Sequence, residues 1–421
     1  MNKPKRFAAN LALVAAGVLA AFLIAEVVVR VTGLANVSLY TWAPYRGWTL
    51  KDNTAGWQTD EGKGFVSVNS AGFRGPEWKV AKPPGTYRIA VIGDSFTEGA
   101  QVNYKHTFCA VAQRALSKCK AMAGKKVQVM DFGIDAYGTA QEIMTLDRHA
   151  WKYSPDMVVL AFFSGNDVRN NSVVLESDKC RPFYVYKGDL LVLGGPFETS
   201  RWWYISCLMR FESRHSQVLN LLGDAKSDFR EHVRQWEAER SKSEEREAAK
   251  RATHRHGYTK ASARAGASQH ERGLNDNIYH PPTSRVWKRA WRVTDGLLTM
   301  LYHDTQAHHV PLLVVTLANP PQIYPNAAVR ASYMQIYHST NIFYPGDRIK
   351  ALGERDGFTV LNLAPPMQAY VDEHHVFLCG FKDTRMGIGH WNAAGHHLAG
   401  ELIAQRICQM LSTGTVQASA R

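Results

Sequence analysis

The chain has 421 residues, of which 45% are hydrophobic and 21% charged, and this composition excludes wholesale disorder and supports a buried core. A net charge of +13 favours anionic surfaces such as phospholipid headgroups or acidic polysaccharide. The Lys and Arg residues are scattered and lack zinc-finger spacing or an RNA-binding aromatic signature, so nucleic acid is not an expected partner.

The chain begins with a basic tip, residues 1–6, and an apolar segment, residues 7–30. The uncharged run from Phe7 to Ala25 is close to the length that crosses a hydrocarbon core. A cleaved secretory signal has a similar composition, but this run is longer than a usual signal core and no Ala-x-Ala site closes it. Basic residues before the run place the N-terminus in the cytoplasm. The sequence therefore predicts a single-pass anchor with the rest of the chain exported.

The chain has six cysteines, and no two of them are spaced as a CxxC pair, which argues against a zinc site or a thioredoxin-like redox motif. Export permits disulfides. If one helix carried both Cys109 and Cys119, they would lie about 15 Å apart by helical rise, which is too far for a disulfide unless the helix ends between them. No metal and no cofactor is expected.

Residues 31–84 are rich in Gly, Pro and Trp and predict an irregular lead-in or small cap. From Tyr87 onward, continuous apolar runs alternate with helical patterns, which indicates a parallel sheet covered on both faces. The predicted strands are Tyr87–Ile92, Val127–Phe132, Met157–Phe163, Leu312–Leu317 and Thr359–Leu363. The predicted helices are Phe108–Leu116, Ala140–Tyr153, Arg285–Ala307, Asp347–Glu354 and Ala393–Met410. The prediction is a doubly wound α/β domain over residues 85–412 with a mostly parallel five-stranded sheet, followed by a flexible tail, 413–421.

A polar insertion is predicted at about residues 170–284 inside this domain. Its most polar part, residues 221–275, is dense in Glu, Arg, Lys, Ser and Ala and offers few apolar side chains for docking. We expect an exposed helix that passes into a loop.

Three polar or small residues follow predicted strands by one to four positions: Ser95, Gly133 and Asn166. Ligands of parallel α/β sheets bind outside the carboxyl ends of the strands, where such loops meet. A serine hydroxyl needs a neighbouring base, and His390, before the last helix, is the candidate. The backbone N–H groups of Ser95 and Gly133 and the side-chain amide of Asn166 can stabilise an oxyanion. Together these residues predict an acyl-transfer site.

These residues resemble the SGNH or GDSL-type hydrolases in four blocks, found at residues 93–99, 132–139, 165–167 and His390. The segment Asn69–Gly75 is also similar to membrane-anchored bacterial members. The resemblance implies a flavodoxin-like three-layer α/β/α sandwich and ester hydrolysis or acyl transfer without a metal. It also implies a bacterial inner membrane location with the catalytic domain in the periplasm.

The sequence departs from that family pattern three residues before the histidine, where Gly387 replaces the usual aspartate. The nearest carboxylate is Asp383, with Asp372 and Glu373 further upstream. Asp383 can complete a triad if the loop folds back, or a backbone carbonyl can hold the imidazole and leave a Ser–His dyad.

The sequence thus predicts an exported, membrane-tethered serine esterase or deacetylase that acts on O-acyl groups of envelope or extracellular glycans. Two alternatives stay open. An O-acetyltransferase of an exopolysaccharide would bind a sugar hydroxyl in place of water. A non-catalytic glycan-binding protein could retain the fold with a degenerate site, a reading that Gly387 favours.

Overall fold

The computed structural model describes residues 3–32, 39–59, 61–194, 201–212, 216, 218–219, 276–382 and 384–414. The chain divides into two compact units: residues 1–42 with 206–262, and residues 43–205 with 263–421. All the site residues predicted above belong to the second unit. The polar segment 221–275 lies outside the described residues.

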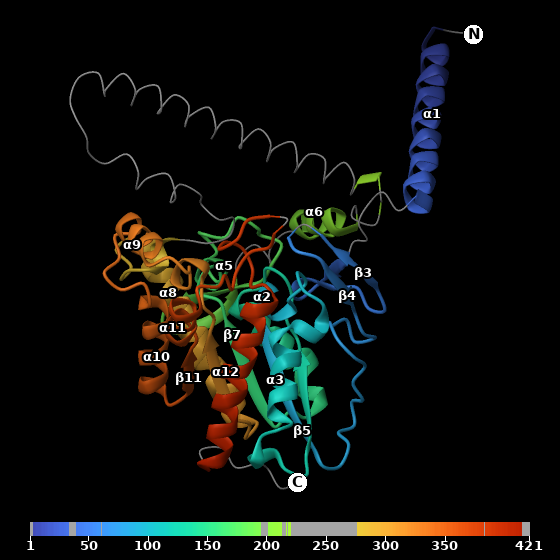
Figure 1. Ribbon diagram of the computed structural model, residues 1–421. Helices are drawn as coiled ribbons and strands as arrows, with labels where there is room; N and C mark the ends of the chain where they lie inside the picture. Colours follow the sequence, from blue (N-terminus) through green and yellow to red (C-terminus); the bar gives the residue numbers. More distant parts are fainter. Residues whose placement is uncertain are drawn as a thin grey trace, which may run out of the picture. The chain divides into compact units, whose positions relative to one another are not determined.

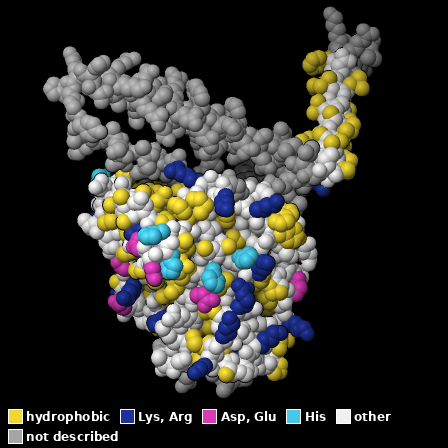
Figure 2. Space-filling model, viewed as in Figure 1, with side chains coloured by type: hydrophobic (Ala, Val, Ile, Leu, Met, Phe, Trp, Pro, Cys, Tyr) yellow, Lys and Arg dark blue, Asp and Glu magenta, His cyan; other side chains and the backbone are white. Residues whose placement is uncertain are grey.

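The first unit contains α1 (Lys3–Thr32), the helix formed by the apolar N-terminal segment. Its part Asn10–Thr32 has a mean hydropathy of 2.6 and is long and apolar enough to cross a membrane. Figure 2 shows apolar side chains along its surface, and Leu13 is 71% exposed. Arg30 pairs with Glu26 at 2.7 Å near the end of the helix. This length and composition suit both a membrane anchor and a signal sequence.

The second unit is built on a five-stranded sheet in which every neighbouring pair is parallel, in the order β11–β10–β7–β5–β6 (Figure 1). Its strands are β5 (Thr86–Gly93), β6 (Lys126–Asp131), β7 (Met157–Phe162), β10 (Leu312–Thr316) and β11 (Thr359–Asn362). This order is that of the flavodoxin-like doubly wound sheet. The predicted fold class is therefore confirmed.

Helices cover the sheet because its central strands are apolar on both sides, and all residues of β5 and β7 are buried. On one face, α3 packs against α12, and both join the core formed by the sheet and α11. On the other, α4 contacts β5 and α8. The main helices are α3 (Phe108–Leu116), α4 (Thr139–Thr145), α8 (Arg285–Ala307), α10 (Tyr344–Asp356), α11 (Ala364–His374) and α12 (Ala393–Ser412).

Several elements differ from the sequence prediction or were missed by it. The helix predicted over Ala140–Tyr153 is α4 followed by a π turn, Leu146–Ala150, and a 3₁₀ turn, Trp151–Tyr153. The lead-in is not irregular, because it contains β1 (Tyr40–Ala43), β2 (Gly47–Leu50), β3 (Ala55–Gln58) and β4 (Gly64–Ser67). Other additions are α2 (Ser95–Glu98), α5 (Asp167–Asn170), β8 (Phe183–Lys187), β9 (Leu190–Gly194), α6 (Arg201–Glu212) and α9 (Ala327–Ile336).

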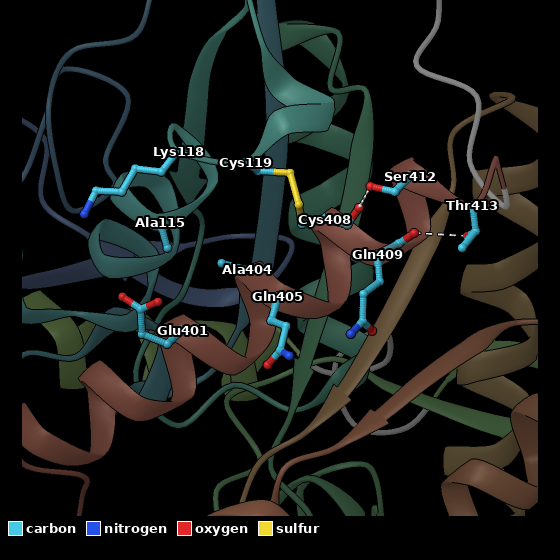
Figure 3. A pocket seen from close by; sticks show the side chains of 10 residues that line it. All are labelled: Ala115, Lys118, Cys119, Glu401, Ala404, Gln405, Cys408, Gln409, Ser412 and Thr413. Atoms are coloured by element: carbon cyan, nitrogen blue, oxygen red, sulfur yellow. Dashed lines mark hydrogen bonds between the residues drawn. A yellow bond between two sulfur atoms is a disulfide. The ribbon is translucent and has the colours of Figure 1, made fainter.

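A disulfide joins Cys119 to Cys408, with their Cα atoms 6.1 Å apart. Because α3 ends at Leu116, Cys119 lies beyond the helix, and Cys109 remains a buried free thiol. A groove of about 400 Å³ lies beside this disulfide, and its lining residues come from the ends of α3 and α12 and the segment after α3 (Figure 3). A helix that follows a parallel strand runs back toward the amino ends of the strands, so the groove lies at the opposite end of the sheet from Ser95.

Candidate active site

The three predicted loop residues lie at the same edge of the sheet, because β6 and β7 are the two neighbours of β5. Ser95 lies two residues beyond the end of β5, Gly133 two beyond β6, and Asn166 four beyond β7. The carboxyl ends of parallel neighbours lie side by side, and this topology brings the three loops together.

Ser95 is the first residue of the short helix α2 and is 5% exposed. The helix is capped by Asp94, whose side chain accepts a hydrogen bond of 3.0 Å from the backbone N–H of Phe96. Gly93 allows the turn to pack closely, since a Cβ there would lie 2.1 Å from the Thr97 hydroxyl. The motif Gly-Asp-Ser thus forms a tight turn from strand to helix that fixes the serine at the sheet edge.

His390 contacts Ser95 directly, with its Nε2 atom 2.9 Å from the serine Oγ. The loop that carries it is anchored by the next residue, Trp391, a fully buried side chain whose indole N–H donates to the Ala318 carbonyl at 3.1 Å. Asn392 then caps α12. The imidazole is therefore held between a buried anchor and a helix N-terminus, with its base nitrogen facing the serine.

The other side of the imidazole is occupied by Glu61, a residue that the sequence analysis did not single out. The Nδ1–H of His390 donates to one carboxylate oxygen at 2.6 Å, and the backbone N–H of His390 donates to the other at 2.8 Å. A carboxylate only accepts, so the proton lies on Nδ1 and Nε2 is free to accept from Ser95. Ser95, His390 and Glu61 form one hydrogen-bonded row.

Glu61 takes the place that the sequence analysis gave to Asp383, which lies outside the described residues. Gly387 stands where the hydrolases that the sequence resembles carry an aspartate. It has a positive φ of 85°, and a Cβ there would lie 2.4 Å from the ring of Tyr324. A side chain therefore does not fit at Gly387. Gly389 is equally constrained, because its Cβ would lie 1.8 Å from a carboxylate oxygen of Glu61. The two glycines let the histidine loop approach its aromatic and acidic neighbours.

Glu61 belongs to the connection between β3 and β4, an antiparallel hairpin that is fixed to α2 and the loop that follows it. Arg74 is fully buried and donates to the Phe65 carbonyl on β4 at 3.2 Å and to the Glu98 carbonyl on α2 at 2.7 Å. The side chain of Asn103 accepts from the N–H of Phe65 at 3.0 Å. These bonds hold the hairpin that carries Glu61 against α2, the helix that begins at Ser95.

The predicted oxyanion donors differ in their availability. The backbone N–H of Ser95 has no hydrogen-bond partner among the residues that the structure describes. The Asn166 amide donates to Asp94 at 3.0 Å through its nitrogen, which leaves its second hydrogen. The N–H of Gly133 donates to Asp131 at 2.9 Å and is engaged. Two of the three predicted donors are thus open in this state.

Electrostatics at the site favour a positive imidazole. Burial lowers the pKa of His390, but the hydrogen bond and charge of Glu61, with smaller effects of Asp135 and Asp94, raise it above its ordinary value overall. Burial raises the pKa of Asp94 to about 6, against the lowering effect of its hydrogen bonds with Asn166 and Phe96. The negative groups stabilise the imidazolium that forms when His390 takes a proton.

Over the described ranges, no group of three or more His, Cys, Asp or Glu side chains is arranged to hold a metal ion. No protein-family model and no curated protein matches the chain.

Several solved structures of esterases and acylhydrolases are similar to this chain. An acetyl xylan esterase is 11% identical, with 76% of this chain and 99% of that chain covered and a TM-score of 0.35. A lipase/acylhydrolase from Enterococcus faecalis is 13% identical, with 80% and 100% covered and a TM-score of 0.37. A GDSL-like lipase from Bacteroides thetaiotaomicron is 10% identical, with 76% and 88% covered and a TM-score of 0.31.

Proposed function

We propose that this protein is a serine esterase or deacetylase that acts through an acyl-serine intermediate. The observation that carries the proposal is the row of hydrogen bonds from Ser95 through His390 to Glu61. It joins a nucleophile to a base and the base to an orienting carboxylate, as nucleophilic acyl transfer requires.

In the first step, the Ser95 Oγ bonds to the ester carbonyl carbon while its proton passes to Nε2 of His390. The carbonyl oxygen gains the negative charge and accepts hydrogen bonds from the Ser95 N–H and the Asn166 amide. The N–H of Gly133 can join them once it leaves Asp131. The C–O bond to the alcohol then breaks, and the alcohol takes the proton from His390. Water then bonds to the acyl carbon while His390 takes one of its protons. The bond from that carbon to Ser95 Oγ breaks, the acid leaves, and His390 returns the proton to Oγ.

We infer that the ester belongs to an O-acylated glycan of the cell envelope or the extracellular space. The apolar helix α1 supports export and tethering, and the basic residues in its first turns favour an external catalytic unit. The Cys119–Cys408 disulfide is typical of an oxidising compartment. The net charge of +13 suits an acidic polysaccharide. The same site would serve an O-acetyltransferase if a sugar hydroxyl replaced water. The non-catalytic alternative loses its support, because Glu61 supplies the carboxylate that Gly387 lacks.

The test is covalent labelling of the full chain by a fluorophosphonate probe, together with turnover of a short-chain chromogenic ester. We expect labelling and turnover in the natural protein, and loss of both in Ser95→Ala with little change in melting temperature, because the hydroxyl is small and makes one side-chain hydrogen bond. Undiminished turnover in Ser95→Ala would exclude the proposed nucleophile.

A further inference from the structure

The hairpin that carries Glu61 has one face toward the protein and one toward solvent. Along β4, Gly64 and Val66 are buried while Phe65 and Ser67 are exposed. A Cβ at Gly64 would lie 2.1 Å from the Ala100 carbonyl, so the inner face packs tightly on the loop after the nucleophile. Because the inner face is packed in this way, the position of the outer face does not depend on contacts of its own side chains.

Two aromatic side chains lie directly opposite each other on this outer face. Trp57 on β3 pairs in register with Phe65 on β4, and their ring centroids are 5.3 Å apart in an edge-to-face arrangement. Trp57 is 50% exposed and Phe65 42%. The Lys63 amine lies 5.3 Å from the centroid of the indole ring. Aromatic surface and a hydrogen-bond donor thus meet on one small face.

The hairpin does not need this pair to stay in place. Arg74 and Asn103 already bind the backbone of Phe65, and Gly64 is seated against the neighbouring loop. A cross-strand aromatic pair adds only about 0.2–1 kcal/mol to a sheet. Single exposed apolar residues are ordinary, but a paired Trp and Phe beside a cation provides a surface that stability does not require.

The pair is also close to the site along the chain. Trp57 and Phe65 each lie four residues from Glu61, which is hydrogen-bonded to His390. Four extended residues span at most about 14 Å. A group that rests on these rings therefore lies within a few sugar rings of the reacting ester.

We propose that Trp57, Phe65 and Lys63 form a subsite for a sugar ring of the glycan that carries the ester. The proposal rests on the proposed function. A sugar ring has an apolar C–H face that packs on an aromatic ring and hydroxyl groups that accept from an amine. The neighbouring exposed side chains, Ala55 and Ser67, are small, so the face offers far less apolar surface than a protein partner needs, about 800 Å² per side.

The test compares the turnover of two substrates by the full chain in detergent. One is an acetylated polysaccharide, for which the released acetate is measured, and the other is a short chromogenic ester. We expect Trp57→Ala to lower the ratio of kcat/KM for the polysaccharide to kcat/KM for the short ester about tenfold, mainly through KM. Trp57→Tyr should retain most of the ratio. Leu190→Ala is the control, because Leu190 is 72% exposed on a different hairpin, and it should leave the ratio as it is.

An unchanged ratio in Trp57→Ala overturns the subsite. Equal losses on both substrates also overturn it, because they indicate that the variant displaces Glu61 instead. Weaker retention on anionic phospholipid vesicles with an unchanged ratio would assign the face to a membrane.

Polysaccharide binding by variants that lack Ser95 tests the subsite independently of the proposed ester hydrolysis. Affinity electrophoresis in polysaccharide gels should show retardation of Ser95→Ala and weaker retardation of the double variant Ser95→Ala, Trp57→Ala. If the natural protein shows no ester turnover while this difference in retardation persists, the proposed function fails and the subsite stands.

Discussion

Replacing Glu61 by glutamine tests the part of the site that the sequence did not reveal. Glu61 accepts two hydrogen bonds from His390, one from the backbone N–H and one from Nδ1–H. A glutamine has one oxygen, so it satisfies one of these donors and presents its NH₂ group to the other. The ring escapes this conflict by moving its proton to Nε2. In that tautomer His390 cannot take the proton of Ser95.

The expected loss follows from the same geometry. A hydrogen bond to a charged group contributes about 1.5–3 kcal/mol. The attraction between a carboxylate and an imidazolium about 4 Å away contributes about 4 kcal/mol at an effective dielectric constant near 20. These two contributions overlap, so we expect a loss of about 3–4 kcal/mol in transition-state stabilisation, or about 10²–10³-fold in kcat/KM.

The pH profile supplies a second readout with a definite sign. His390 must be neutral to act as a base, so kcat/KM rises with pH through its pKa. Glu61 raises that pKa and burial lowers it. Glu61→Gln removes the upward effect, so the rising limb of the profile should move to lower pH even as the plateau falls.

The assay is kcat/KM for a short chromogenic ester between pH 5 and 9, with Asp383→Asn as the matched control because it removes the carboxylate nearest in sequence. A Glu61→Gln enzyme within about threefold of the natural one, with an unmoved limb, would refute the role of Glu61. A larger loss in Asp383→Asn than in Glu61→Gln would transfer that role to Asp383.

Two further variants test the framework around the site. Gly389→Ala should lower kcat/KM about as much as Glu61→Gln, because the new Cβ would lie 1.8 Å from a Glu61 oxygen; full activity would contradict this packing. Replacing Cys119 and Cys408 by serine removes a link across 289 residues and should cost about 2–5 kcal/mol of unfolding free energy, seen as a lower melting temperature, with kcat/KM nearly unchanged. An equal melting temperature would show that the disulfide does not stabilise the domain.

The sheet could be predicted from sequence because its strands are continuous apolar runs. Met157–Phe162 is buried at every position, and such a short apolar run is typical of a strand covered on both faces. The same pattern gave the order of strands and helices and placed Ser95, Gly133 and Asn166 beyond strand ends. Short strands rich in glycine, such as Gly64–Ser67, carry no comparable signal, and the lead-in therefore looked irregular.

Glu61 could not be found by the same reasoning because its partner is 329 residues away in the chain. Nothing in the local sequence separates it from any exposed carboxylate in a turn. The sequence did contain an indirect indication of a close neighbour, in the loop that leads to His390. Gly387 and Gly389 both have positive φ and both meet a neighbour where a Cβ would be. Two such glycines beside His390 indicate that other chain segments approach it closely.

Because Glu61 belongs to the lead-in, residues 31–84, the proposed chemistry depends on that segment. In a site whose aspartate precedes the histidine by three residues, one loop carries both groups and its fold sets their geometry. Here the acid and the base arrive from opposite ends of the domain, and Arg74 joins the acid's hairpin to the nucleophile helix through the carbonyls of Phe65 and Glu98. The lead-in is therefore part of the catalytic unit that we propose, because without it His390 would lose the carboxylate that orients it.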